Sequence, residues 1–240
     1  MKTIGKIALL AATILTSACQ SEFSDLSKTE ELQPADFVFN FDMSQSSLNS
    51  SDRDYAAALG QRLQRELLAE NPQLGDRVVT IKFGDRGPQN FVSNAVRLSR
   101  QHGAKPVAQA LGQFVAGLPD SPDAGQQSTN ILFPLLNGDF RCTPGRGGIW
   151  IVSDMVSTGI DFDDVQGLLD GTAEIPVPQG APLKSCRITV IGIGALADDA
   201  GQLSSQQILN LIAVWQRFFI SAGVSPADLR FMTTLSKETR

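Results

Sequence analysis

Histidine, cysteine and clustered positive charge are scarce in this 240-residue chain. It contains one histidine, three cysteines and 20 basic against 25 acidic residues, which gives a formal net charge of −5. Because no basic cluster is present, the chain lacks the electrostatic footprint of a nucleic-acid-binding protein. The sole histidine, His102, stands in a polar Ser-Arg-Gln-His-Gly context, and no Gly-x-Ser-x-Gly motif occurs. We therefore expect no nucleic-acid partner, and a histidine at an exposed loop or helix end rather than a catalytic base.

The N-terminus differs from the rest of the chain. Lys2 and Lys6 precede an apolar run over 7–15, and the small residues of 16–18 lead to Cys19. This is the layout of an export signal, and the run is too short to span a bilayer. Its ending, Leu-Thr-Ser-Ala-Cys, resembles the lipobox of bacterial lipoproteins, in which the cysteine is acylated. We predict a lipoprotein signal peptide over 1–18 and a lipid on Cys19, with an ordinary secretory signal as the alternative.

A polar segment follows the predicted lipidation site. Residues 20–33 are rich in Ser, Glu, Asp, Lys and Thr, which is typical of a solvated linker. We predict a flexible tether over 19–34 and one domain over 35–240, since this length suits a single well-cored domain. Acyl chains, each stabilising membrane attachment by about 0.8 kcal/mol per buried CH₂, would hold the protein on a membrane. Gln20 instead of aspartate after the cysteine favours the outer membrane, facing the periplasm.

Two cysteines remain once Cys19 is assigned to the lipid. Cys142 and Cys186 would then be exposed to an oxidising compartment, where a disulfide between them is the simplest arrangement. Two free buried thiols are the alternative.

Short apolar runs alternate with helical patterns through the rest of the chain. Strand-like runs lie at 37–41, 77–83, 91–98, 148–153, 187–193 and 229–232. Helical patterns lie at 52–68, 105–118, 129–136 and 204–222. This alternation predicts an α/β fold, with a doubly wound, mostly parallel sheet and helices on both faces. The run at 148–153 suits a strand buried on both faces, and the weaker run at 91–98 suits a sheet edge.

Two further motifs have ordinary structural explanations. Residues 192–197 fit the loose Gly-x-Gly-x-x-Ala form of a dinucleotide fingerprint, but Asp198 and Asp199 follow and would repel a pyrophosphate. A strand end that needs glycine explains the motif better. Trp215, Phe218 and Phe219 recur at helical spacing, which favours core packing over a partner-binding ridge.

Oxygen-bearing side chains gather at the ends of two predicted strands. Asp42, Ser44 and Ser46 follow the run at 37–41, and Asp154 follows the run at 148–153. The carboxyl ends of parallel strands share one edge of the sheet, where ligands bind in α/β proteins. Thr129, with Ser128 as its rival, lies at a predicted helix start that the same edge can reach. Grouped oxygen donors suit a hard cation, so we predict a site for Mg²⁺ or Mn²⁺.

These residues resemble the von Willebrand factor type A domain with its metal-ion-dependent adhesion site. That family has Asp-x-Ser-x-Ser after its first strand, a threonine in a later loop and an aspartate after its fourth strand. The order of strands and helices also agrees from about residue 36 onward. The resemblance implies a Rossmann-like fold over 35–240, in which Ser44, Ser46 and Thr129 touch the cation while Asp42 and Asp154 act through water. Met155 stands where the family often has glycine.

The expected function is therefore binding rather than catalysis. The chain would be a membrane-anchored, exported protein-binding module that uses the cation to capture a carboxylate of a partner protein. Two alternatives stay open. In the first, the Ser-rich segment is only a turn and helix cap in a structural envelope lipoprotein. The second is a metal-dependent hydrolase, which usually needs more direct carboxylate or histidine ligands.

Overall fold

Six strands form one sheet in the computed structural model, which describes residues 33–85, 92–159, 162–177, 179–197 and 201–235. The strand order is β3-β2-β1-β4-β5-β6, and every neighbouring pair is parallel except β2 and β3. This is the order of a doubly wound α/β sheet, so the predicted fold class is confirmed. The predicted signal peptide, Cys19, nearly all of the tether, and Asp198 and Asp199 lie outside the described residues.

The strands agree with the predicted runs to within a few residues. They are β1 (Asp36–Asp42), β2 (Arg77–Phe83), β3 (Val92–Arg97), β4 (Gly148–Val152), β5 (Ile188–Ile191) and β6 (Leu229–Met232). All seven residues of β1 are buried, because this strand lies in the middle of the sheet with a helical layer on each face. The edge position predicted for β3 is confirmed.

The helices are α1 (Leu48–Ser51), α2 (Arg53–Ala69), α3 (Ala104–Ala116), α4 (Leu132–Asn137), α5 (Val165–Asp170) and α6 (Ser205–Ser221). The helix predicted at 129–136 begins later, at Leu132, which places Pro134 in its first turn, where a missing N–H is harmless. The short helices α1 and α5 were not predicted, because four and six residues carry too little periodicity. No helix in the described part of the chain is long and apolar enough to cross a membrane.

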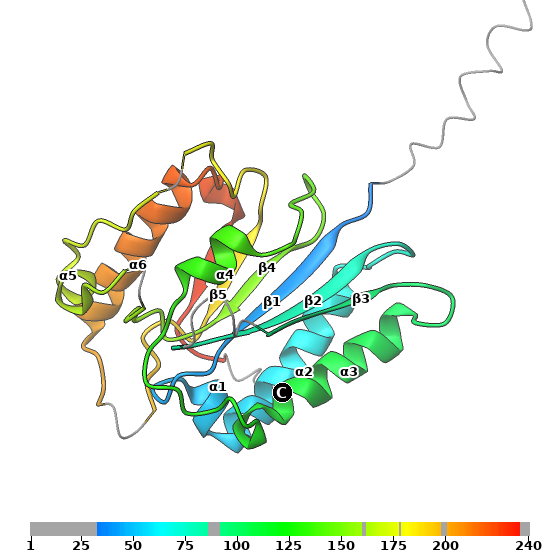
Figure 1. Cartoon of the computed structure of the whole chain (residues 1–240), viewed down its shortest axis with the longest axis horizontal. Helices are drawn as coiled ribbons and strands as arrows, with labels where there is room; N and C mark the ends of the chain where they lie inside the picture. The colour runs from blue at the N-terminus through cyan, green and yellow to red at the C-terminus, as the bar shows by residue number, and fades with distance from the viewer. Residues whose placement is uncertain (1–32, 86–91, 160–161, 178, 198–200, 236–240) are drawn as a thin grey trace, which may run out of the picture. The chain divides into compact units, whose positions relative to one another are not determined.

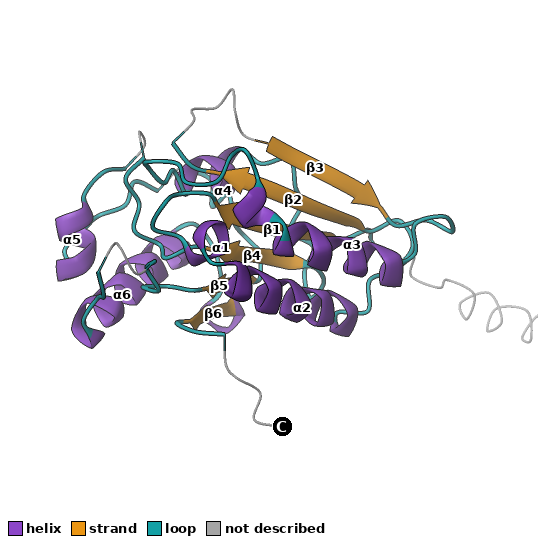
Figure 2. Ribbon diagram, turned by 90° about the horizontal axis from the view of Figure 1, so that it is seen from below, coloured by secondary structure: helices purple, strands orange, loops and turns teal. Residues whose placement is uncertain are grey.

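Helices cover both faces of the sheet (Figures 1 and 2), and a hydrophobic cluster lies on each face. The phenylalanines of β1, at 37, 39 and 41, point toward α2 and α3 and pack with leucines of those helices. Val38 and the isoleucines of β4 point the other way, toward α4, α5 and α6. The alternation of side chains along each strand therefore divides the core into two layers.

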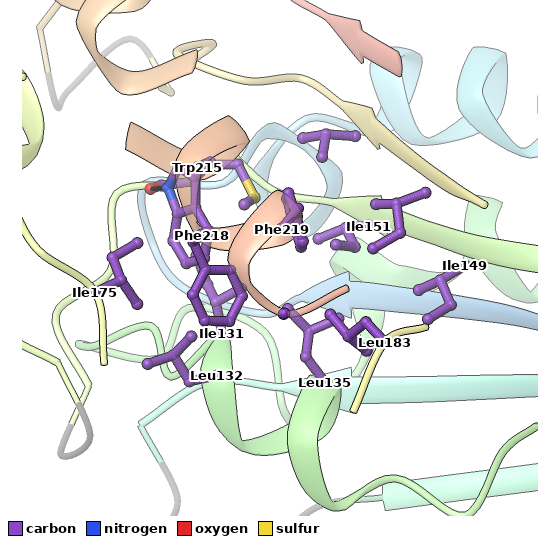
Figure 3. Packing of buried hydrophobic residues seen from close by; sticks show 14 of the residues in the cluster. Ile131, Leu132, Leu135, Ile149, Ile151, Ile175, Leu183, Trp215, Phe218 and Phe219 are labelled. Atoms are coloured by element: carbon purple, nitrogen blue, oxygen red, sulfur yellow. Dashed lines mark hydrogen bonds between the residues drawn. The ribbon is translucent and has the colours of Figure 1, made fainter. Parts of the chain in front are cut away.

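The aromatic group of α6 belongs to the second layer (Figure 3). Trp215 and Phe219 are fully buried, and Trp215 meets Phe218 edge to face with ring centroids 5.6 Å apart. The indole Nε1 of Trp215 donates a hydrogen bond of 2.8 Å to the carbonyl of Met155, in the loop after β4. The prediction that these aromatics form core is confirmed, and they also fix a loop at the edge of the sheet.

A disulfide joins Cys142 to Cys186, as predicted, and the alternative of free thiols is wrong. The two residues are 44 positions apart and precede β4 and β5, respectively. The bridge therefore connects the two segments that lead into neighbouring parallel strands.

Candidate metal centre

Four of the five predicted ligands meet at the carboxyl edge of the sheet. Asp42 is the last residue of β1, and Asp154 lies just beyond β4, which pairs with β1 in parallel. Ser44 and Ser46 lie in the turn after β1. Residues 112 positions apart in sequence are thus brought together, because neighbouring parallel strands end at the same edge.

Side-chain oxygen atoms of Ser44, Ser46 and Asp154 lie close to one another. The hydroxyl of Ser46 donates to Oδ2 of Asp154 over 2.6 Å, and it lies 3.3 Å from the hydroxyl of Ser44. Neighbouring oxygen ligands of an octahedral Mg²⁺ are separated by about 2.9 Å when each lies about 2.1 Å from the ion. The hydroxyls of Ser44 and Ser46 are therefore close to the spacing of two neighbouring magnesium ligands, and Asp154 accepts a hydrogen bond from one of them.

The turn after β1 is held by its own polar groups. The backbone N–H of Ser44 donates to Oδ1 of Asp42 over 2.9 Å, which is an Asx-turn. The amide of Asn49 donates to the carbonyl of Asp42, and the hydroxyl of Ser50 donates to the carbonyl of Ser44. All of these groups are buried. The local sequence thus folds the turn so that the serine hydroxyls at 44 and 46 lie side by side.

Ser153 is a site residue that the sequence patterns did not single out. Its hydroxyl donates to Oδ2 of Asp42 over 2.7 Å and also accepts the N–H of Met155. The sequence did contain a signal for it, because Ser153 stands directly before Asp154 at the end of a predicted strand. Its role follows only from the register of β1 and β4, which sets their ends side by side.

Thr129 lies beside the loop that contains Asp154. Its N–H donates to the hydroxyl of Thr158 over 2.9 Å, and its carbonyl accepts from the N–H of Thr158 and the hydroxyl of Ser157. Its side chain is buried, whereas its rival Ser128 is half-buried. The hydrogen bonds that connect the other four residues do not include the Thr129 hydroxyl.

The loop of Thr129 also contacts the turn after β1. The carbonyl of Gln126 accepts the N–H of Gln45 over 2.7 Å, and the N–H of Gln126 donates to the carbonyl of Met43. Three separate segments of the chain are thus joined by backbone hydrogen bonds around one rim, defined here as 42–46, 126–129 and 153–158.

The rim contains two buried carboxylates, those of Asp42 and Asp154. Burial first, and then the nearby charge of Asp154, raise the pKa of Asp42 to about 7, against hydrogen bonds from Ser153 and Ser44 that lower it. Burial likewise raises the pKa of Asp154, against the hydrogen bonds from Ser46 and Val156. Within the described residues, no lysine, arginine or histidine forms an ion pair with either aspartate. Buried charge of this kind is unfavourable unless a proton or a cation neutralises it.

The stability of the cation-free protein should depend on pH at this pair. The pKa of Asp42 is about 7 when folded and 3.8 when unfolded, so the folded chain binds more protons between these values. The contribution of Asp42 to the free energy of unfolding is therefore greatest at low pH and is lost as the pH rises toward 7. We expect the Tm measured with chelator to fall from about pH 5 to about pH 8. The fall should be smaller in Asp42→Asn, and an equal fall in that variant would contradict this assignment.

Met155, next to Asp154, adopts a left-handed backbone conformation with φ of 65°. Glycine reaches this region freely, whereas a side chain that is fully buried, as here, does so at a cost of about 1–2 kcal/mol.

Two other sequence candidates have structural explanations, and the second borders the rim, because the N–H of Gly194 donates to the carbonyl of Asp154 over 2.9 Å. His102 is exposed just before α3, as expected for a loop or helix-end histidine. Gly192 and Gly194 follow β5 with φ of 90° and 72°, and a Cβ on Gly194 would lie 2.7 Å from Ile208. The glycines are therefore explained by the strand end.

Comparison with known proteins finds only distant similarity. No protein-family model matches the chain, and no curated protein matches it. Two crystal structures of the pilus adhesin SpaC from Lactobacillus rhamnosus GG are similar. The open conformation has a TM-score of 0.44 and 17% identity over 84% of this chain and 28% of that chain. The other form has a TM-score of 0.44 and 16% identity over 85% and 29%. The chain thus spans less than a third of the adhesin, and the similarity is too distant to assign a family.

Proposed function

We propose that this chain is a protein-binding module of the von Willebrand factor type A kind, which uses Mg²⁺ or Mn²⁺ to capture an acidic group of a partner protein. The observation that carries the proposal is the pair of buried carboxylates at the carboxyl edge of the sheet. Asp42 accepts the backbone N–H of Ser44, and Asp154 accepts the hydroxyl of Ser46, which lies beside the hydroxyl of Ser44. Thr129, from the neighbouring loop, completes the proposed set.

The donor set supports binding rather than turnover. A cation held largely by neutral hydroxyls and water keeps its attraction for a further anionic ligand. Ser44 and Ser46 supply such hydroxyls, and Asp42 and Asp154 balance the charge from within the protein. A carboxylate of a partner protein is the ligand that this arrangement suits, because it is a hard oxygen donor with a negative charge. We propose no catalytic residue.

The disulfide supports the proposed location. Disulfides form and persist in oxidising compartments, and Cys142–Cys186 is such a bond. Together with the export signal and the lipobox-like ending at Cys19, it favours a protein anchored by lipid in the cell envelope, at the outer membrane facing the periplasm.

The test uses Mn²⁺ as a probe of both cation and ligand. We expect calorimetric titration at about pH 8 to give one Mn²⁺ or Mg²⁺ per chain, since a higher pH favours the ionised aspartates that a cation would neutralise. A bound Mn²⁺ with exchangeable water enhances the relaxation of water protons. A peptide that is amidated at its C-terminus and contains one glutamate should reduce this enhancement, whereas the same amidated peptide with glutamine should not. Absence of any binding heat for both cations would refute the proposal.

A structural role without metal is the second candidate. The Asx-turn of Asp42 and the hydrogen bonds of Asn49 and Ser50 hold the turn without any ion. That reading predicts the same thermal stability with and without divalent cations. A metal-dependent hydrolase is a third and weaker candidate, because the described residues include no cluster of three or more His, Cys, Asp or Glu side chains suited to a metal.

A further inference from the structure

The outer edge of β3 is the more exposed of the two edges of the sheet. Figure 2 shows β3 as the outermost strand, and β2 is the strand that pairs with it among the described residues. Ser93 to Arg97 are all exposed. Natural proteins usually protect such edges with short strands, charges or proline. The opposite edge, β6, has four residues with Arg230 among them, whereas β3 has six residues and no charge before Arg97.

An apolar groove runs beside this edge, between the sheet and α3. Its volume is about 350 Å³, and its lining includes Val78, Thr80, Asn94, Val96, Ala110 and Phe114. Val96 and Asn94 come from β3 itself, so the groove begins directly at the edge strand. Val96 is 40% exposed, which leaves apolar surface open to a ligand. Grooves of this size and lining are typical of binding sites.

The surroundings of the groove differ in charge from the rest of the protein. No aspartate or glutamate occurs from residue 86 to residue 119, although the whole chain has a net charge of −5. Arg97, Arg100 and Lys105 are exposed along this stretch, beside the lining residues of the loop before α3. The buried Asp76, which contacts the end of β3 through Leu98, is already paired with Arg146. The groove is therefore complementary to an acidic ligand.

We propose that β3 and this groove bind an extended acidic segment of a partner protein, which adds to the sheet as a further strand. An exposed strand edge offers a row of N–H and C=O groups that another polypeptide backbone can pair with along its whole length. Alternate side chains of an added strand point to one face, where the groove would take the apolar ones. Carboxylates of the segment would lie near Arg97, Arg100 and Lys105. This combination favours a peptide over a lipid, which would use the groove alone.

This site is separate from the proposed metal centre. Val78, in the groove, pairs with Phe37, at the opposite end of β1 from Asp42. Binding at β3 should therefore persist in the presence of chelator. Measuring it in excess EDTA makes its outcome independent of whether the metal proposal holds.

The experiment titrates the full-length protein with the synthetic peptide acetyl-Glu-Val-Thr-Val-Thr-Val-Glu-amide in EDTA. Binding is followed by the fluorescence anisotropy of a dye-labelled copy of the peptide, and amide hydrogen exchange of the protein is followed at 92–97. We expect binding, slower exchange of β3 amides, and at least about tenfold weaker binding of a version with lysine at both ends. Two further peptides carry N-methyl groups at alternate residues, one at odd and one at even positions. The one whose methyl groups replace the backbone N–H groups that face β3 should bind poorly, and the other should still bind.

A matched pair of variants tests the location. Ala110 lines the groove and Gln109 does not, yet both are exposed on α3, so Ala110→Arg and Gln109→Arg add the same charge to the same helix. Only Ala110→Arg should weaken binding, by at least about tenfold, because its side chain fills the groove. Equal binding by the two variants, or no binding by the wild-type protein at millimolar peptide, would overturn the proposal. Unchanged exchange at β3 despite binding would also overturn it and would indicate a site for apolar ligands without strand addition.

Discussion

Asp154→Asn should abolish the stabilisation of this protein by Mg²⁺ and yet make the cation-free protein more stable. The substitution removes one of two buried negative charges, and the Asp42 carboxylate loses the neighbour that raises its pKa. The hydrogen bonds can be kept, because the asparagine Oδ1 can accept from Val156 and its amide can donate to the hydroxyl of Ser46. Stability and cation binding should therefore change in opposite directions.

The measurement is thermal unfolding at about pH 8 with and without Mg²⁺. A ligand that binds only the folded state stabilises it by about 2.7 kcal/mol at one hundred times its Kd, and we expect an increase of this size in the wild-type protein. Asp163→Asn, the same change at an exposed aspartate, is the control and should retain the increase. A wild-type Tm that does not change with Mg²⁺ or Mn²⁺ would favour a structural role without metal. A cation-free Asp154→Asn protein that is less stable than wild type would contradict the charge argument.

Asp42→Ala provides a second comparison at the same site. It should also abolish cation binding without unfolding the domain. Unlike Asp154→Asn, it leaves the N–H of Ser44 and the hydroxyl of Ser153 without their acceptor, so it should not share the gain in stability. The contrast separates the effect of charge from the effect of lost hydrogen bonds.

Replacing both Cys142 and Cys186 by serine should destabilise the folded protein by about 4 kcal/mol. The bridge closes a loop over a sequence separation of 44, and in the chain-entropy model a loop of this length restricts the unfolded state by that amount. Urea unfolding, followed by circular dichroism, should show a lower midpoint with a similar or larger slope. Wild-type protein unfolded in the presence of a reducing agent is the control and should match the double variant. A loss below about 1 kcal/mol would contradict the expected role of the bridge.

The fold was predictable because its elements carry strong periodic signals. The apolar runs of β1, β2 and β4 and the helical spacing in α2 and α6 each favour one kind of structure. The start of α4 was less predictable, because Ile131 and Leu132 continue the apolar pattern on both sides of the boundary. Short elements such as α5 depend on caps and packing more than on periodicity, here the Asp164 side chain at its first turn.

The site was only partly predictable. That Asp42 and Asp154 approach one another follows from strand order alone. The hydrogen bond from Ser153 to Asp42 depends on the register between β1 and β4, which the sequence does not display. The place of Thr129 depends on an irregular loop fixed by Thr158 and Gln126, residues that no local pattern connects to it. The raised pKa values arise from burial, which is a property of the assembled protein.

The unusual backbone of Met155 has a mechanical consequence. Its N–H is held by Ser153, its carbonyl by the indole of Trp215 and its side chain by the surrounding core. These contacts anchor the segment after β4 directly to α6, so the two cannot relax independently. A substitution that leaves a cavity beside Trp215, at Phe218 for example, should therefore make the backbone of the polar rim more mobile. Phe218 itself lies in the core and is not one of the proposed cation-binding residues.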